Sequence, residues 1–163
     1  MTAALNVQAA DFRYTRNRMI LANATNQAVL GILTNASADR MWLEGNRFEG
    51  TVDAGTATAI RIVGDDEVVV KDNYIVGAYT GTLGGLENVT TDCTNILIVG
   101  NYIENRTAAS TIAMTLRAAS TGFFANNRLS VLGGAAAVVF AAGSNGGGNY
   151  QSFVAGVTAA ALL

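Results

Sequence analysis

The chain contains no histidine and no proline, and it has one cysteine and one lysine among its 163 residues. Without histidine it lacks the side chain whose ordinary pKa lies nearest neutrality, so few of its groups can act as a general acid or base at neutral pH. The single cysteine, Cys93, cannot form a disulfide within the chain. We expect it to be a buried, unreactive thiol. These absences argue against an enzyme.

Charge is also scarce, at 13% of the residues, with a formal net charge of −2. A chain with so few basic residues lacks the basic stripe that nucleic-acid binding requires. No stretch approaches the 18 or more apolar residues of a transmembrane helix. The first residues also lack the basic segment and apolar run of a secretory signal. With half of its residues hydrophobic, the chain is predicted to be one domain with a sizeable core, without nucleic-acid or membrane partners.

The sequence is built around a repeated motif, which consists of a short apolar strand, a small or polar residue, an asparagine and a second short apolar strand. The four clear copies span 41–50 (MWLEGNRFEG), 68–77 (VVVKDNYIVG), 96–105 (ILIVGNYIEN) and 122–131 (GFFANNRLSV), and their asparagines are Asn46, Asn73, Asn101 and Asn127. Weaker copies surround Asn17 and Asn149, and the successive intervals are 29, 27, 28, 26 and 22 residues. Self-similarity at this period is typical of a solenoid of stacked repeats.

Aligned on the asparagine, the repeats share apolar columns five and three residues before it and two residues after it. These columns hold Phe12, Met41, Val68, Ile96 and Gly122; Tyr14, Leu43, Val70, Ile98 and Phe124; and Met19, Phe48, Ile75, Ile103 and Leu129. The period of two predicts strands whose apolar side chains point inward. The asparagine is predicted to form the bend between two strands, because it tolerates the left-handed region and its amide can bond to backbone or to a stacked neighbour.

The pattern apolar-x-apolar-x-Gly-Asn-x-apolar-x-Gly, as in 43–50 and 98–105, resembles the right-handed parallel β-helix family of pectate lyases and phage tailspikes. The resemblance implies an all-β, right-handed, single-stranded parallel β-helix of about five to six coils with three short strands per coil. The predicted single domain, 1–163, has its coils at 12–153 and a C-terminal cap or strand at 154–163. Residues 1–11 are predicted to be an N-terminal arm or cap, with a short helix through Val7 to Ala10 as an alternative.

An enzyme of this family would need clustered carboxylates as catalysts or calcium ligands. The best cluster is 65–67 (Asp-Asp-Glu) with Asp39 and Asp92. Asp39 and Asp66 are expected to stack about 4.8 Å apart, either as a calcium site or, more simply, as a solvated polar turn. We therefore predict no catalytic residues, metal or cofactor. Loops 51–58 and 78–85, with Tyr79 as their aromatic, leave a carbohydrate-binding or carbohydrate-cleaving tailspike-like module as the alternative.

The column four residues before the asparagine is predicted to face outward, because it alternates with the inward columns. It holds Arg13 followed by Trp42, Val69, Leu97 and Phe123. An apolar stripe of this length is larger than monomers usually expose, and it predicts a subunit interface. Since three β-helices commonly pack around one axis in the phage proteins that the chain resembles, we expect a homotrimer.

The leading hypothesis is a non-enzymatic structural protein of a phage virion. It would be a trimeric capsid decoration or cement protein made in the host cytoplasm. Its partner would be the major capsid protein or another virion protein.

Overall fold

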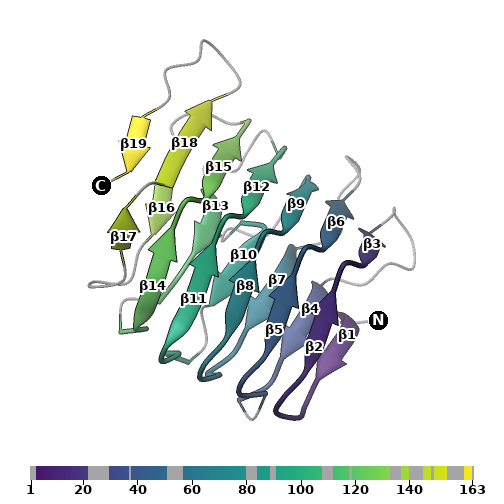
Figure 1. Cartoon of the computed structure of the whole chain (residues 1–163). Coiled ribbons are helices and arrows are strands. Elements are labelled where there is room, and N and C mark those ends of the chain that lie inside the picture. Colours follow the sequence, from purple (N-terminus) through teal and green to yellow (C-terminus); the bar gives the residue numbers. More distant parts are fainter. Residues whose placement is uncertain are drawn as a thin grey trace.

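The computed structural model is an all-β solenoid. It describes residues 3–21, 30–36, 38–50, 57–79, 84–88, 91–107, 112–117, 119–132, 137–139, 145–147, 149–153 and 160–162, with side chains in the part before residue 133. These residues form nineteen strands and no helix. Each coil contributes one strand to each of three sheets, so strands of successive coils lie side by side (Figure 1).

The three sheets are named here in the order in which the chain enters them. The first sheet holds β1 (Ala3–Val7), β4 (Leu30–Thr34), β7 (Thr58–Ile62), β10 (Leu86–Asn88), β13 (Ile112–Thr115) and β16 (Ala137–Val139). The second holds β2 (Arg13–Thr15), β5 (Trp42–Glu44), β8 (Val69–Lys71), β11 (Ile96–Val99), β14 (Gly122–Ala125) and β17 (Asn145–Gly147). The third holds β3 (Arg18–Leu21), β6 (Arg47–Gly50), β9 (Tyr74–Gly77), β12 (Tyr102–Asn105), β15 (Arg128–Val131), β18 (Asn149–Phe153) and β19 (Ala160–Leu162). Neighbouring strands are parallel except β18 and β19, which are antiparallel.

The register of the sheets confirms the columns predicted from the sequence. Leu43, Val70, Ile98 and Phe124 are successive partners in the second sheet, and Phe48, Ile75, Ile103 and Leu129 are partners in the third. All eight side chains are at most 1% exposed and belong to one continuous core. The predicted all-β parallel β-helix with three strands per coil is therefore confirmed.

The number of coils is slightly lower than predicted. The register shifts between β13 and β16 and again between β14 and β17. The solenoid makes about four turns, rather than the five to six coils expected. The glycine- and alanine-rich sequence beyond residue 132 supplies few large side chains to pin a register, which accounts for the loss of regularity.

The N-terminal segment is part of the solenoid, and the alternative of a short helix there is wrong. β1 pairs in parallel with β4, with Leu5 opposite Ile32 and Val7 opposite Thr34. Ala3, Leu5 and Val7 are more buried than Ala4 and Asn6, which is the period of a strand. This strand therefore begins the first coil, and it lies at the edge of the first sheet.

Each coil turns sharply at the residue before the motif asparagine. Arg16, Gly45, Asp72, Gly100 and Asn126 have φ between 52° and 67°. A second bend with positive φ lies six residues before the asparagine, at Asp11, Arg40, Glu67 and Asn95. The left-handed conformation thus falls one residue earlier than the sequence suggested. The asparagine itself forms hydrogen bonds to the neighbouring coils.

Candidate functional site

Charged and aromatic side chains line the outer face of the third sheet. Register places Arg18, Arg47, Tyr74, Tyr102 and Arg128 in one column along this face. The Arg47 guanidinium lies 4.6 Å from the centre of the Tyr74 ring, and that ring stacks on Tyr102 at 5.1 Å and 9°. The Arg128 guanidinium lies 5.3 Å from the Tyr102 ring. We call Arg47, Tyr74, Tyr102 and Arg128 the Arg–Tyr stack.

The Arg–Tyr stack was missed by sequence reasoning, although the signal was present. The four residues occupy the column immediately after the motif asparagine, which alternates with the inward columns. Each ring face of the two tyrosines is covered by a neighbour in the stack. The stack therefore joins four coils to one another, and it does not offer free ring faces on which a sugar or a base could lie.

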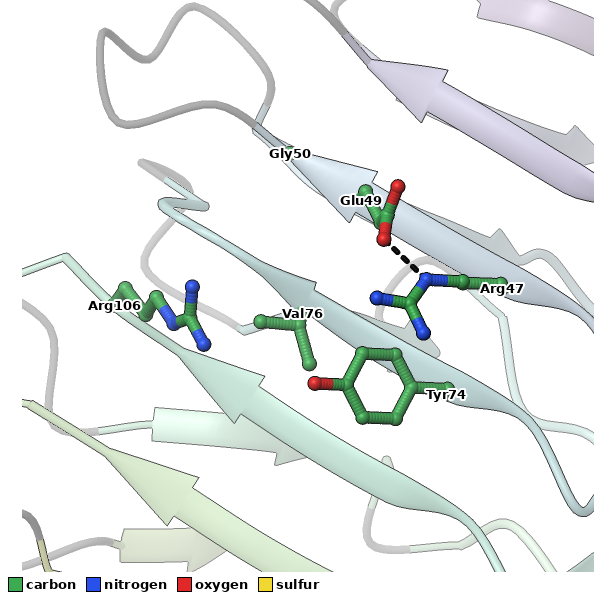
Figure 2. Close-up of a pocket in the computed structure, with 6 residues that line it drawn as sticks. All are labelled: Arg47, Glu49, Gly50, Tyr74, Val76 and Arg106. Carbon is green, nitrogen blue, oxygen red and sulfur yellow. Dashed lines mark hydrogen bonds and ion pairs between the residues drawn. The ribbon is translucent and has the colours of Figure 1, made fainter.

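A shallow pocket of about 180 Å³ lies beside the Arg–Tyr stack. Its lining consists of Arg47, Glu49, Gly50, Tyr74, Val76 and Arg106 (Figure 2). In Figure 2 the Tyr74 hydroxyl and the Arg106 guanidinium lie on either side of Val76. Hydrogen bonds from Arg47 and Arg18 hold the pKa of Glu49 below its ordinary value, so this carboxyl is ionised.

Tyr79, the aromatic expected on the loop face, is instead buried completely in the core. Its ring fills space left by Gly50, Gly77 and Gly85, where a Cβ atom would lie 2.9–3.3 Å from ring atoms. Burial raises the pKa of its hydroxyl, which has no hydrogen-bond partner among the residues that the structure describes. Tyr79 cannot stack on a sugar, and the rest of the loops predicted for that role lies mostly outside the described residues.

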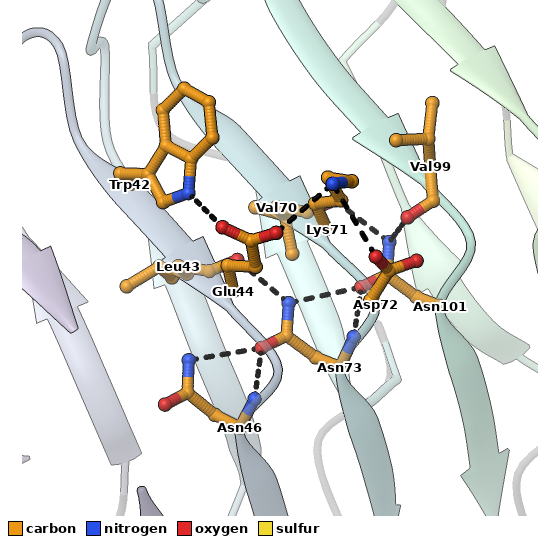
Figure 3. Close-up of polar contacts among 10 residues, drawn as sticks. All are labelled: Trp42, Leu43, Glu44, Asn46, Val70, Lys71, Asp72, Asn73, Val99 and Asn101. Carbon is orange, nitrogen blue, oxygen red and sulfur yellow. Dashed lines mark hydrogen bonds and ion pairs between the residues drawn. The ribbon is translucent and has the colours of Figure 1, made fainter. Parts of the chain in front are cut away.

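The motif asparagines form a continuous ladder inside the bend (Figure 3). The backbone N–H of each of Asn17, Asn46, Asn73 and Asn101 donates to the side-chain oxygen of the asparagine in the next coil, at 2.9–3.0 Å. The side-chain amides of Asn46, Asn73 and Asn101 donate to that same oxygen at 2.9–3.0 Å. They also donate to carbonyls of the preceding coil, such as Leu43 for Asn73.

Burial explains why asparagine is used at these positions. Asn46, Asn73, Asn101 and Asn127 are at most 2% exposed. At each rung the side chain supplies an acceptor for a buried backbone N–H, and its amide reaches buried acceptors in return. The predicted structural turns are therefore a hydrogen-bonding ladder that holds coils together.

Carboxylates of the predicted acidic cluster also accept hydrogen bonds from the backbone. The side-chain oxygen of Asp39 accepts from the N–H of Asp66 at 3.0 Å, and that of Asp66 accepts from the N–H of Thr94 at 3.0 Å. Asp65 points inward, where it accepts from the Thr34 hydroxyl and the Ala38 N–H, and burial raises its pKa. In the part of the chain that the structure describes, no three His, Cys, Asp or Glu side chains are arranged to hold a metal ion.

Cys93 is buried as predicted, beside the amide of Asn88, and burial raises its pKa to about 11. The thiol is therefore not a ready nucleophile.

The structure places the predicted interface residues on the outer face of the second sheet. Trp42, Val69, Leu97 and Phe123 are successive partners across β5, β8, β11 and β14. Phe123 is 50% exposed, and the other three are partly exposed. We call these four residues the apolar stripe. The C-terminal strand β19 pairs with β18 in the third sheet and therefore does not lie over the stripe.

Polar contacts beside the apolar stripe fix its first member. Trp42 donates from its indole N–H to Glu44 at 2.8 Å, and Lys71 donates to the other oxygen of Glu44 at 3.0 Å (Figure 3). These two hydrogen bonds, that from Trp42 above all, lower the pKa of Glu44. The Arg13 guanidinium lies 5.9 Å from the Trp42 ring. A pocket of about 300 Å³, lined in part by Arg13, Trp42 and Val69, opens at this end of the stripe.

These features define a parallel β-solenoid with two distinct outer faces, one apolar and one rich in arginine and tyrosine. None of the described elements is a helix that could cross a membrane. No protein-family model, no curated protein and no solved structure matches the chain significantly. The assignment of a role therefore rests on the surfaces themselves.

Proposed function

We propose that this chain is a non-enzymatic structural protein that associates with copies of itself through the apolar stripe. The single observation that carries the proposal is the unbroken outer column Trp42, Val69, Leu97 and Phe123, because contiguous exposed apolar surface marks interaction sites. A homotrimer around one axis would bring the three stripes together and remove them from water.

Within that proposal, the assembled trimer is a decoration or cement protein on a phage capsid, bound to the major capsid protein or another virion protein. This step is supported by the likeness of the motif to the β-helices of phage proteins. Asp39 and Asp66 accept backbone N–H groups, and Glu49 and Glu104 pair with arginines, which also favours a structural role over hydrolysis. The same coils, stacked through ladders of buried asparagine, suit a protein that must resist unfolding on a particle surface.

The test of self-association is light scattering after gel filtration at micromolar concentration. The wild-type protein should have three times the monomer mass, and Phe123→Asp should lower the mass to that of the monomer. Ile20→Asp is the matched control, because Ile20 is 54% exposed but lies on the outer face of the third sheet. A wild-type monomer, or equal dissociation in both variants, would contradict the interface.

The virion role has its own test. Mass spectrometry of purified particles should detect the protein in a fixed ratio to the major capsid protein. Particles that lack it would exclude the decoration role while leaving self-association intact.

The alternative, a carbohydrate-binding or carbohydrate-cleaving tailspike-like module, predicts measurable glycan binding. Tyr79 cannot mediate it, because the ring is fully buried. Binding to host-surface glycans, on an array or by calorimetry, would favour this alternative over the structural role.

A further inference from the structure

The outer face of the third sheet carries more arginine than carboxylate. Among the described residues of this face, four guanidinium groups, those of Arg18, Arg47, Arg106 and Arg128, accompany two carboxylates, those of Glu49 and Glu104. The chain as a whole has a formal charge of −2, so this local surplus of positive charge opposes the overall balance. Fields of one sign gathered on one face attract ligands of the opposite sign.

Both carboxylates on this face are already occupied by donors. Glu49 accepts from Arg47 through one oxygen and from Arg18 through the other. Glu104 accepts from the Tyr102 hydroxyl at 2.7 Å and from the Arg106 Nε at 2.7 Å. Burial raises the pKa of Glu104, but the bonds from Arg106 and Tyr102 outweigh it, so the net shift is downward.

The arginines that line the pocket, in contrast, keep donors free. Arg47 and Arg106 each bond to a glutamate through Nε. Among the described residues, neither Arg47 nor Arg106 uses its terminal Nη groups in a hydrogen bond, and the Tyr74 hydroxyl has no hydrogen-bond partner. The pocket therefore presents two guanidinium groups and one phenol as donors, from three successive coils, beside the carboxylate of Glu49, which is already paired with Arg47 and Arg18.

Two of these donors are held in place before any ligand arrives. The Tyr74 ring lies between the Arg47 guanidinium at 4.6 Å and the Tyr102 ring at 5.1 Å. The Arg47 guanidinium is also held by its hydrogen bond to Glu49 through Nε. Donors fixed in this way lose little freedom on binding.

We propose that this pocket binds a tetrahedral oxyanion group, a phosphate or sulfate, through Arg47, Arg106 and the Tyr74 hydroxyl. Arginine forks match the oxygens of such groups and form charge-assisted hydrogen bonds with them. With about 180 Å³ and an open side, the pocket can take the group either free or as an ester on a larger molecule. The site lies on the third sheet, so it is independent of the apolar stripe.

The test is a two-dimensional NMR titration of arginine side-chain and backbone signals with inorganic phosphate, inorganic sulfate and glucose 6-phosphate. Sodium chloride of matched ionic strength is the reference. We expect saturable shifts around Arg47, Tyr74 and Arg106 at about 1–10 mM ligand. Tighter binding of glucose 6-phosphate than of inorganic phosphate would mean that the ligand is presented on a sugar. Equal binding would mean that the free group is sufficient.

Arg106→Gln should weaken binding at least about tenfold, because one charge-assisted donor pair is lost. Arg117→Gln is the matched control, since Arg117 is also ion-paired, to Asp92, and is similarly exposed. Arg47→Lys provides a second variant that keeps the charge but loses the fork, and it should weaken binding as well. Shifts that never saturate, or equal weakening by Arg106→Gln and Arg117→Gln, would overturn the proposal. Thermal melting checks that each variant is folded.

Discussion

The side-chain oxygen of Asn101 accepts two hydrogen bonds from Asn73, one from its backbone N–H at 2.9 Å and one from its side-chain amide at 3.0 Å. Asn101 is 1% exposed. Its own amide donates to carbonyls of Val70 and Val99. One side chain therefore satisfies buried groups on two neighbouring coils.

Asn101→Ala should accordingly lower the free energy of unfolding by about 2–4 kcal/mol, because the buried Asn73 N–H loses its acceptor and the Asn73 amide loses one of its hydrogen bonds. Urea denaturation followed by circular dichroism measures the change. Asn17→Ala is the matched control at the exposed end of the ladder, where the side chain donates to the Thr15 carbonyl of its own coil. We expect less than about 1 kcal/mol there. An equal loss of unfolding free energy at both positions would show that the buried asparagines stabilise the fold no more than the exposed one does.

Gly100 should tolerate a side chain less well than Gly45, although both have positive φ. Alanine at either position costs about 1–2 kcal/mol for the left-handed backbone. At Gly100 the added Cβ would also overlap Oδ1 of Asp72, whereas at Gly45 the nearest atom lies 3.5 Å away.

A double-mutant cycle tests this account of Gly100. Gly100→Ala should cost more than Gly45→Ala, and Asp72→Gly should remove the extra cost. A penalty at Gly100 that persists with Asp72→Gly would mean that backbone strain alone is responsible.

Tyr79→Phe should leave stability unchanged or raise it by up to about 1 kcal/mol, because the buried hydroxyl has no hydrogen-bond partner in the described part of the chain. Tyr79→Ala should cost about 3–5 kcal/mol, since it empties the space beside Gly50, Gly77 and Gly85. Tyr102→Phe is the control that removes a used hydroxyl, the one bonded to Glu104. It should lower stability by about 1 kcal/mol. Thermal unfolding ranks the three variants, and a marked loss for Tyr79→Phe would mean that the hydroxyl does have a partner.

Asp65 should make the protein less stable as the pH rises above the ordinary carboxyl range. Burial raises its pKa in the folded state above the ordinary value of an aspartate carboxyl. Between the unfolded and folded pKa values the folded state binds more protons, so stability falls with increasing pH through that window. Asp65→Asn should remove this part of the pH dependence, as measured by unfolding between about pH 3 and pH 8.

Asp11 should have the opposite effect on the pH dependence of stability. The hydrogen bond from Arg40 holds its pKa below the ordinary value, so its contribution is present at neutral pH and is lost as the pH falls. Asp11→Asn should therefore flatten the loss of stability at acid pH, whereas Asp65→Asn should flatten the loss of stability as the pH rises toward neutrality. The same change in both variants would contradict these assignments.

Much of the coil could be predicted because the asparagine motif fixes the register. Once Asn46, Asn73, Asn101 and Asn127 are aligned, a period of two decides which neighbours face the core. The same alignment places Trp42 and its column on the outside, as the structure does.

Three features escaped prediction, each for a physical reason. The first strand has a weak signal because Ala3 and Ala4 are small, and only its pairing with β4 reveals it. Tyr79 follows β9 in a segment that resembles a polar loop, and its burial depends on glycines from three separate coils. The pocket of Arg47, Tyr74 and Arg106 depends on the side-chain conformations of residues from neighbouring coils. An alignment of the repeats does not show these conformations.

The asparagine ladder also has a direction. The side-chain oxygen of each asparagine accepts a hydrogen bond from the backbone of the coil before it. The N–H of Asn46 therefore needs Asn73 as its acceptor, and the N–H of Asn73 needs Asn101. During synthesis from the N-terminus, the bend of one coil stays unsatisfied until the following coil, 26–29 residues later, has left the ribosome. Folding of the nascent chain should therefore trail elongation by one full coil.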